Sequence, residues 1–329
     1  MQITANHPLP AGFIARQPTL DDVQAVTDLF NAAERAEYGR GTLTEEIVRT
    51  SWESHDMDLA QDALLIATDE GRVVATADME HRQHARIYCS ATVHPDFCER
   101  GLGSYLVDWL DRQARRHIAL AEPDVRVYLL NRVSSVNQPA KQLIEQAGYT
   151  HIRSHWQMEI DMTEPPAAPQ WPEDIILRPF VVGQDDHSVY ELDEEAFSDH
   201  WGHMPTSFES WAHWSINRPG FDPALWFLAF DSDTLAGISL CRYENGDGWV
   251  GALAVRRPYR HLGLGMALLR HSFAEFYRRG TRKVGLGVDA QNLTGATRLY
   301  QRAGMHIARQ ADFYEKELRP GRELSVQSL

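Results

Sequence analysis

Residues 255–266 read VRRPYRHLGLGM and join the end of an apolar run to the start of an amphipathic pattern. The run before them, residues 249–255, has the composition of a buried strand. From Leu264 to Arg279 apolar residues recur at helical spacing, and Gly280 ends the pattern. A helix N-terminus offers unpaired N–H groups and partial positive charge, which glycines leave accessible. The stretch therefore predicts a strand, an anion-binding loop and a helix.

Two other interpretations of this loop are open. A dinucleotide-binding turn needs a third glycine and an acidic residue at the end of the next strand. Position 268 is leucine, and only Asp289 stands where the acidic residue belongs. An ordinary strand-to-helix turn is the second alternative, and the repetition of the motif elsewhere in the chain makes it less attractive.

The motif occurs twice. Residues 93–103, VHPDFCERGLG, match residues 255–265 at an offset of 162 positions. The same offset relates residues 14–16 and 176–178, each of which precedes a predicted helix. A shared offset indicates a tandem duplication.

A proline-rich segment separates the two copies. Residues 161–172 read DMTEPPAAPQWP and lack apolar periodicity, as is typical of a semi-rigid linker. We therefore expect an N-terminal domain of residues 1–162, a linker of residues 163–172 and a C-terminal domain of residues 173–329. Oligomeric state is not predicted by this pattern.

Composition narrows the function classes. The 329 residues suffice for two domains, and 32 basic against 46 acidic residues give a net charge of −14, which disfavours nucleic acid and anionic membranes as partners. We expect a cytoplasmic protein, because the sequence shows neither a membrane-spanning run nor a secretory signal. Cys89, Cys98 and Cys241 lack metal-ligand spacing, so neither a disulfide framework nor a zinc site is expected.

Each half alternates strands with helices. In the second half, residues 225–230 and 235–240 predict paired strands, and an Asn-Gly turn leads into the strand at 249–255. Residues 283–288 predict a further strand, followed by a helix that ends before Gly304. We expect an α/β (α+β) fold of two tandem domains, each a mixed, mostly antiparallel sheet flanked by helices.

The second copy resembles the GCN5-related N-acetyltransferases (GNAT family), and its tandem layout is similar to that of the mycothiol synthases. The resemblance rests on the pattern V-x-x-x-x-R-x-x-G-x-G, a later asparagine and L-Y-x-x-x-G. These residues are Val255, Arg260, Gly263, Gly265, Asn292, Leu299, Tyr300 and Gly304.

The resemblance implies acetyl-CoA as cosubstrate. The strand before the loop would splay from its neighbour, bind the pantetheine arm and supply an oxyanion donor, and the loop N–H groups would bind the pyrophosphate. The implied cofactor residues are Leu253, Ala254, Val255, Arg260, His261, Leu262, Gly263, Leu264 and Gly265. Tyr300 would donate a proton to the departing thiolate, with an amphipathic core position as its alternative. Asn292 would orient a group at the site or cap the helix.

The first copy is incomplete. It keeps Val93, Arg100, Gly101, Leu102 and Gly103 as candidate cofactor residues. Cys98 stands at the arginine position, and Ile144, which cannot donate a proton, stands at the tyrosine position. We therefore expect the first domain to be catalytically impaired.

The sequence does not single out one residue as the general base. Trp249 stands where the mycothiol synthases carry a glutamate, and Asp247, Glu244 and the acidic and histidine residues of 194–203 are the candidates. His200-x-x-His203 lacks a third clustered ligand, so no metal is expected. The tryptophans nearby would line an acceptor pocket or belong to the core. They are Trp201, Trp211, Trp214 and Trp226.

These observations predict an acyl-CoA-dependent N-acyltransferase that transfers acetyl directly to a primary amine of a small molecule. A noncatalytic acyl-CoA sensor and an acetyltransferase of protein N-termini or lysines are the alternatives.

Overall fold

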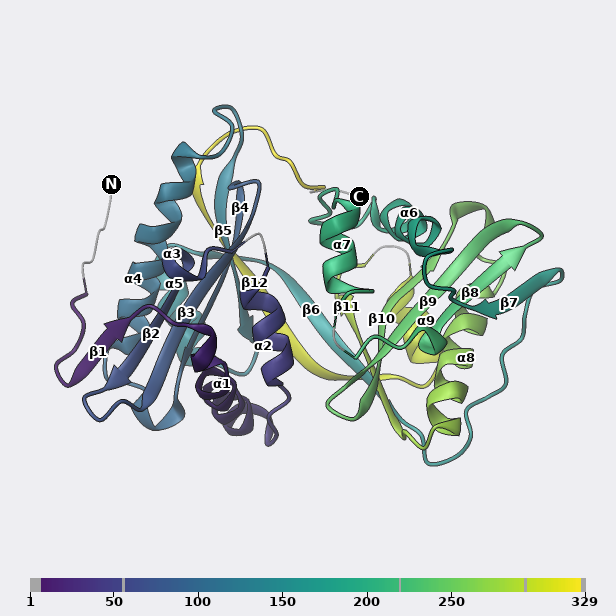
Figure 1. Ribbon diagram of the computed structural model, residues 1–329, viewed down its shortest axis with the longest axis horizontal. Helices are drawn as coiled ribbons and strands as arrows, with labels where there is room; N and C mark the ends of the chain where they lie inside the picture. Colours follow the sequence, from purple (N-terminus) through teal and green to yellow (C-terminus); the bar gives the residue numbers. More distant parts are fainter. Residues whose placement is uncertain (1–6, 55–56, 219, 293–294, 327–329) are drawn as a thin grey trace. The chain divides into compact units, whose positions relative to one another are not determined.

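The computed structural model describes residues 7–54, 57–218, 220–292 and 295–326 (Figure 1). It divides into two compact units. Unit 1 holds the chain up to Arg153 together with Ala311–Leu324, and unit 2 holds Ser154–Gln310 and the residues from Ser325 on. Within its described residues, the structure has no helix long and apolar enough to cross a membrane.

Unit 1 has the strand order β1-β2-β3-β4-β5-β12. Its strands pair antiparallel except for the parallel pair β4 and β5. Its elements are β1 (Phe13–Arg16), η1 (Leu20–Asp22), α1 (Val23–Tyr38), α2 (Glu45–Trp52), α3 (Leu59–Asp62), β2 (Ala63–Thr68), β3 (Val73–Arg82), β4 (Arg86–Val93), η2 (Pro95–Phe97), α4 (Leu102–Ala114), η3 (Arg115–Ala119), β5 (Val127–Ser134) and α5 (Gln138–Gln146).

Unit 2 repeats the plan with the strand order β6-β11-β10-β9-β8-β7. Here the parallel pair is β10 and β11. Its elements are β7 (Ile175–Pro179), α6 (Asp186–Phe197), α7 (Phe208–Trp214), η4 (Pro223–Leu225), β8 (Trp226–Asp231), β9 (Thr234–Glu244), β10 (Asp247–Val255), η5 (Arg257–Tyr259), α8 (Leu264–Arg278), β11 (Lys283–Asp289) and α9 (Ala296–Arg302). The predicted mixed sheet flanked by helices is confirmed in both units.

Each half of the sequence gives its last strand to the other unit. Strand β6 (Thr150–Asp161) continues from the first half of the sequence and pairs with β11. Strand β12 (His306–Arg319) ends the second half and pairs with β5. The units therefore differ from the expected domains 1–162 and 173–329 at these strands. Periodicity indicates that a strand exists, but its pairing partner depends on long-range contacts.

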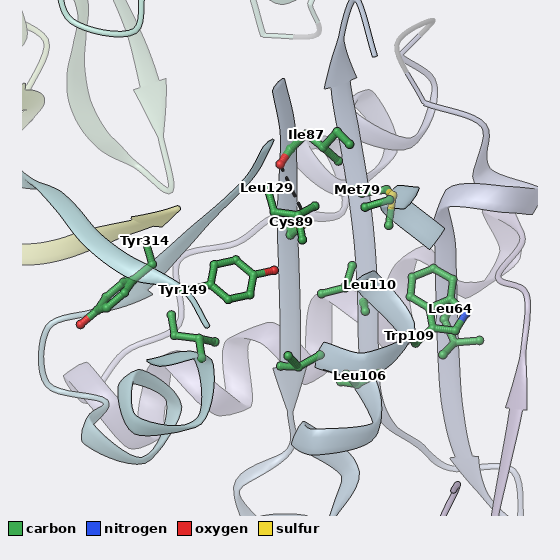
Figure 2. Packing of buried hydrophobic residues seen from close by; sticks show 14 of the residues in the cluster. Leu64, Met79, Ile87, Cys89, Leu106, Trp109, Leu110, Leu129, Tyr149 and Tyr314 are labelled. Carbon is green, nitrogen blue, oxygen red and sulfur yellow. Dashed lines mark hydrogen bonds between the residues drawn. The ribbon is translucent and has the colours of Figure 1, made fainter. Parts of the chain in front are cut away.

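The core of unit 1 forms on both faces of its sheet. Successive residues of β2 alternate between them: Leu64 and Ile66 pack in the cluster that includes α4, and Leu65 packs with residues of α1 and α2. Figure 2 shows part of the α4 side, where Leu106 and Leu110 lie among strand residues. A sheet covered on both faces explains the nearly continuous apolar strands of this unit.

Unit 2 has the same two-sided arrangement. Phe273 and Phe276 of α8 are fully buried in one cluster, with Val250 of β10. Leu192 of α6 and Trp211 of α7 lie in the cluster on the other side, with Ala254 of β10. Strand β10 thus contributes to both layers, and its local geometry determines which residues face each one.

Candidate active site

Strand β10 carries a β-bulge at Gly251. Val250 pairs with Cys241, but the next pair is Ala252 with Leu240, so Gly251 is the extra residue. Before the bulge, Val250 faces the α8 side; after it, Ala254 faces the α6 side. A Cβ at position 251 would lie 3.3 Å from the Leu240 carbonyl oxygen and would collide with the Arg242 side chain. Glycine therefore suits this bulge, a feature that is common beside active sites.

Beyond the bulge, β10 parts from β11. The parallel pairs run from Gly248 with Val284 to Val250 with Leu286. Past this point β10 stays paired with β9 as far as Val255, and β11 stays paired with β6 as far as Asp289. The facing edges of the two strands thus separate after Val250. Backbone groups of residues 252–255 on this edge have no partner in β11 and suit an extended ligand, except the Val255 carbonyl oxygen, which accepts a hydrogen bond from Arg260.

The loop after β10 ends at the N-terminus of α8. Gly263 is the N-cap residue with φ +89°, and nothing lies within 4 Å of the place where a Cβ would stand. At Gly265 a Cβ would lie 3.4 Å from Leu299 and 3.7 Å from Val255. The first glycine permits the left-handed turn, whereas a Cβ at the second would make only ordinary van der Waals contacts. The open N-terminus of a 15-residue helix is suited to an anion.

Arg260 is fastened to the strand that precedes it. Its Nε donates a hydrogen bond to the Val255 carbonyl oxygen at 3.1 Å. Its neighbour His261 has φ +66°, so the backbone turns sharply here. The half-buried guanidinium is thereby held beside the helix N-terminus.

Tyr300 lies in α9 and is 8% exposed. Its ring belongs to the cluster formed by α8 and the sheet, and the preceding residue, Leu299, lies 3.4 Å from the place where a Cβ of Gly265 in α8 would stand. Burial raises the pKa of Tyr300 to about 12. The phenol therefore stays protonated at neutral pH, as a proton donor must.

The structure does not bring Asp247 to this end of the strand. Asp247 begins β10 next to the hairpin turn at Asn245 and Gly246, where β10 and β11 are still paired. Four residues of strand, about 13 Å, separate it from the bulge.

Asn292 follows β11, and its N–H donates to the Asp289 carbonyl oxygen at 3.1 Å. Since the N-cap of α9 is Gly295, the alternative that Asn292 caps this helix is wrong.

His200 carries an unsatisfied buried nitrogen. Its Nδ1 has no hydrogen-bond partner among the residues that the structure describes. Burial lowers the pKa of His200, as does the positive charge of Arg260, whereas Asp289 opposes the shift. Arg260 belongs to the loop after β10, and Asp289 ends β11. The charges of both residues therefore act on His200, one from each of the two strands that separate. It is a neutral imidazole with a free ring nitrogen.

The region between α6 and α7 combines core and polar groups. Trp211 and Trp226 are 8% and 4% exposed and pack against each other, so these two tryptophans are core residues. The Trp211 indole N–H donates to Asp193 at 3.1 Å. Burial raises the pKa of Asp193 to about 6. Trp201 and Trp214 are only partly buried.

Unit 1 keeps the backbone of the site with different side chains. Its parallel pairing also stops early, at Cys89 with Asn131, although β4 continues to Val93. Glu99 has φ +63° and Gly101 has φ +82°, close to the values of His261 and Gly263. Arg100, however, donates to the Asp96 carbonyl oxygen and stacks on Phe97.

Unit 1 has different side chains at the positions that correspond to Arg260, His261 and Tyr300 of unit 2. Cys98 replaces the loop arginine, and the carboxylate of Glu99 stands in the loop. Pro10 lies 3.4 Å from the Cβ position of Gly101, at the start of α4. Ile144 is 4% exposed and packs in the core in place of the tyrosine.

Known proteins share this arrangement in both halves. A model of the acetyltransferase (GNAT) family matches residues 187–305, and a model of the acetyltransferase (GNAT) domain matches residues 60–151. The crystal structure of a GCN5-related N-acetyltransferase from Sphaerobacter thermophilus is 38% identical, with a TM-score of 0.83, and the match covers 96% of this chain and 99% of that one. The chain belongs to the GNAT family. It is a tandem acetyltransferase with two domains of this family.

Two curated relatives of this acetyltransferase are named mycothiol acetyltransferase. The mycothiol acetyltransferase of Thermobispora bispora is 33% identical over 223 residues, which are 64% of this chain and 70% of the relative. That of Catenulispora acidiphila is 27% identical over 311 residues, which are 88% of this chain and 94% of the relative. The family assignment made from the loop motif is thereby confirmed.

Sequence reasoning missed two features of the acetyltransferase site. The bulge at Gly251 has a weak signal, an isolated glycine inside a strand pattern. The orphan Nδ1 of His200 has no signal in the sequence, because a side chain's burial and partners depend on residues far away in the chain.

Proposed function

We propose that unit 2 transfers acetyl from acetyl-CoA to a primary amine of a small molecule. One observation carries this proposal: β10 loses its parallel partner after Val250 yet runs on to Val255 and into the loop before α8. The exposed strand edge suits the pantetheine arm, and the helix N-terminus suits the pyrophosphate. The residues proposed to bind acetyl-CoA in unit 2 are Leu253, Ala254, Val255, Arg260, His261, Leu262, Gly263, Leu264 and Gly265.

The transfer is proposed to be direct. The amine nitrogen attacks the thioester carbon, and a backbone N–H of residues 253–255 stabilises the oxyanion. The C–S bond then breaks, and the thiolate takes the proton of the Tyr300 hydroxyl, which solvent replaces. Coenzyme A and an acetamide are the products.

The proton released by the amine is proposed to go to His200. Asp247 is poorly situated for this role because it lies at the far end of β10, and Glu244 is ion-paired with Arg242. His200 has a buried, unpartnered Nδ1 among the described residues and lies in the electrostatic field of Arg260 and Asp289. Its lowered pKa keeps the ring neutral and able to accept a proton at pH 7.

The base assignment is tested by comparing His200→Gln with His203→Gln. His203 is the matched control, three residues away and paired with Glu194 at 3.5 Å. His200→Gln should lower kcat by about 100-fold and remove the acid limb of the kcat/KM profile. Equal effects of the two substitutions, or an unchanged pH profile in His200→Gln, would refute the assignment.

Unit 1 is proposed to have no catalytic centre. Ile144 has no proton to donate, and Glu99 adds a negative charge where a pyrophosphate would bind. The retained loop residues, Val93, Arg100, Gly101, Leu102 and Gly103, are proposed to give at most weak binding of acyl-CoA.

The acceptor class follows from the relatives. Because they are named mycothiol acetyltransferases, we propose that the acceptor is an amine on a thiol-bearing sugar conjugate. The resemblance to the mycothiol synthases implies a glutamate in the region where this chain has Trp249, so other amines must be compared as acceptors.

The test is a panel of amines with acetyl-CoA, in which acetylated product is measured by mass spectrometry so that acceptor thiols do not interfere. The panel contains an amino sugar bearing a cysteine, the same sugar without it, polyamines, and peptides with free N-termini or lysines. Wild type should acetylate the sugar conjugate, and Tyr300→Phe should not. Tight binding of coenzyme A without turnover on any amine would favour the sensor, and turnover on peptides alone would favour the protein acetyltransferase.

A further inference from the structure

Three histidines meet in unit 1, outside the acetyl transfer site. His81 lies near the end of β3, His84 lies in the turn before β4, and His117 lies in η3 after α4. Each ring offers one nitrogen, and these three atoms lie within 4.8 Å of one another. His117 lies 33 positions after His84 in the sequence, so the fold brings the third histidine to the other two.

The β3–β4 turn aims two of the rings at the third. Gln83 and His84 both have positive φ, +53° and +55°, which folds the turn back on itself. The ring centres of His81 and His84 are 3.9 Å apart, and each lies about 5 Å from that of His117, at 4.9 and 5.0 Å. His84 Nδ1 and His117 Nδ1 are 2.8 Å apart. Two lone pairs cannot face each other at this distance, so a proton or a cation must lie between them.

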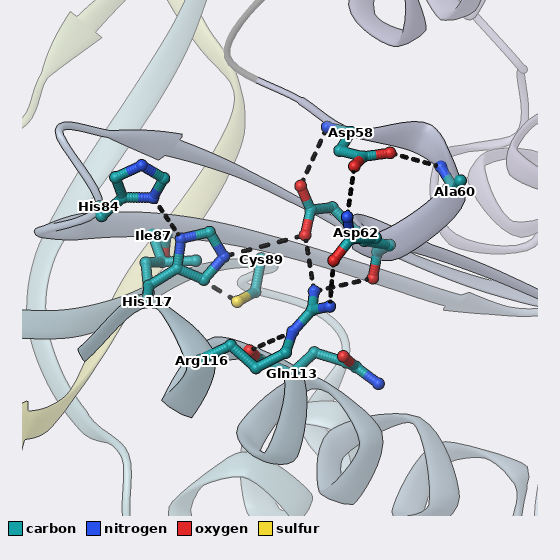
Figure 3. Close-up of polar contacts among 10 residues, drawn as sticks. Asp58, Ala60, Asp62, His84, Ile87, Cys89, Gln113, Arg116 and His117 are labelled. Carbon is teal, nitrogen blue, oxygen red and sulfur yellow. Dashed lines mark hydrogen bonds and ion pairs between the residues drawn. The ribbon is translucent and has the colours of Figure 1, made fainter. Parts of the chain in front are cut away.

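The buried carboxylate of Asp62 lies near the second ring nitrogen of His117. Asp62 is 4% exposed and lies 3.8 Å from His117 Nε2, on the side of the ring opposite His84 (Figure 3). The Asp58 N–H and the Arg116 guanidinium, each at 3.0 Å, fix this carboxylate. Metal-binding histidines commonly have such a carboxylate at their second nitrogen, where it orients the ring and raises its basicity.

We propose that His81, His84 and His117 bind a divalent transition-metal ion, Zn²⁺ being the first choice. Three imidazoles without a thiolate suit Zn²⁺, Ni²⁺, Co²⁺ or Cu²⁺ rather than Mg²⁺ or Ca²⁺, which prefer oxygen.

The geometry needs only a modest adjustment. Zn–N bonds of about 2.0–2.1 Å place tetrahedral nitrogens roughly 3.4 Å apart. The His84–His117 pair at 2.8 Å must open slightly, and the widest pair, at up to 4.8 Å, must close. His81 and His84 are half-buried on a hairpin end, which permits such a shift. A water molecule would complete the coordination.

The ion would fasten the β3–β4 hairpin to the end of α4. The three histidines belong to unit 1, whereas Tyr300 and the α8 loop belong to unit 2, so we infer a structural role for the ion rather than a catalytic one. Sequence reasoning expected no metal because it considered only His200-x-x-His203 and the cysteines. His81-x-x-His84 has the same spacing, and the third ligand, His117, lies beyond α4.

The experiment uses the full-length, untagged protein after removal of metal with a chelator. Isothermal titration with Zn²⁺ and the visible spectrum of bound Co²⁺ report stoichiometry and coordination. We expect one tight ion per chain and a thermal midpoint that rises with Zn²⁺ concentration. His84→Ala should weaken binding at least 100-fold, and Asp62→Asn should weaken it about 10- to 100-fold. The double variant His200→Ala/His203→Ala is the matched control and should bind normally.

Three outcomes would overturn the proposal: no binding to wild type at 100 µM Zn²⁺, unchanged binding in His84→Ala, or loss of binding in the His200/His203 control. Circular dichroism establishes that each variant is folded. His81→Gln, on the other strand end of the hairpin, provides a second ligand variant should His84→Ala fail to fold, and it must also lose the Co²⁺ spectrum.

Discussion

Arg260 Nε donates a hydrogen bond to the carbonyl oxygen of Val255, 3.1 Å away, and so closes the loop between β10 and α8. The contact joins the first and sixth residues of the stretch VRRPYR. It fixes the guanidinium beside the helix N-terminus and leaves its other N–H groups for a ligand. The side chain thus has a structural and a binding role at once.

Replacing Arg260 should therefore affect acetyl-CoA binding more than chemistry. Arg260→Ala should raise KM for acetyl-CoA by about 10- to 100-fold, the equivalent of one charge-assisted hydrogen bond, with kcat changed less than about threefold. Steady-state kinetics with a saturating acceptor measures this. Arg278→Ala, at an exposed arginine paired with Glu275 at the other end of α8, is the control and should change neither constant. A kcat defect without a KM effect would contradict the phosphate-binding role.

Tyr300→Phe should distinguish the proposed catalytic contribution of the hydroxyl from the packing contribution of the buried ring. We expect kcat to fall about 100-fold or more while KM for acetyl-CoA and the thermal midpoint stay nearly unchanged, because the phenyl ring preserves the packing. Tyr149→Phe is the matched control, a buried tyrosine in unit 1. Since the pKa of Tyr300 is raised to about 12, wild-type activity should show no loss near pH 10 from ionisation of this residue. Full activity of Tyr300→Phe would show that Tyr300 only packs in the core and does not donate the proton.

The two glycine loops provide a test of the division between the units. Gly263 and Gly101 are both helix N-cap residues with positive φ, so aspartate is strained to a similar degree at either position. Gly263→Asp also adds negative charge at the proposed pyrophosphate site and should abolish turnover. Gly101→Asp should leave kcat and KM within about threefold of wild type. Calorimetric titration should find one tight coenzyme A per chain. Two equally tight molecules, or equal loss of activity in both variants, would contradict the assignment of the active centre to unit 2.

Asp193 should make stability depend on pH. Its pKa is raised from 3.8 to about 6 by burial, so the folded state favours the neutral acid. This contribution to stability is complete below pH 4 and is lost as the pH rises through 6. At pH 7 Asp193→Asn should therefore raise the free energy of unfolding by about 1–2 kcal/mol, less than the roughly 3 kcal/mol that the shift alone would give, because partial exposure screens it.

Asp185 is the control, because its pKa is shifted in the opposite direction to that of Asp193. Its hydrogen bond with Arg178, at 2.6 Å, lowers its pKa. Asp185→Asn should destabilise the protein at pH 7, and the difference from wild type should vanish as the pH falls through the lowered pKa. Urea unfolding from pH 7 down to about pH 2 measures both variants. A stabilising effect of Asp193→Asn that is constant over this range would exclude titration as its cause.

The elements nearest the loop could be predicted well from the sequence. The helix expected from Leu264 to Arg279 spans Leu264–Arg278, and the strand expected at 249–255 spans Asp247–Val255. These signals are local: apolar periodicity, a stop glycine and an Asn-Gly turn. The domain boundaries were harder to place, because β6 and β12 cross between the units and pairing is not encoded in a strand's own composition.

Some residues of the candidate site could likewise be predicted from the sequence, whereas others could be identified only in the structure. Gly263, Gly265 and Tyr300 are identified by spacing alone, because the loop and the helix that use them are continuous segments. The sequence leaves His200 as one of several candidates for the base, and only its buried nitrogen distinguishes it from the others. Asp247 became a poor candidate through its distance along β10. The cluster of His81, His84 and His117 depends on a hairpin end meeting the end of a helix.

By itself the sequence determined the duplication, the alternation of strands and helices, the loop and the missing tyrosine of the first copy. Each of these is a property of residue order over short distances. Only the tertiary structure decided which sheet the last strand of each half of the sequence joins, where β10 parts from β11 and which side chains are left buried without partners. Such features arise when segments far apart in the chain pack together, and no local pattern records that packing.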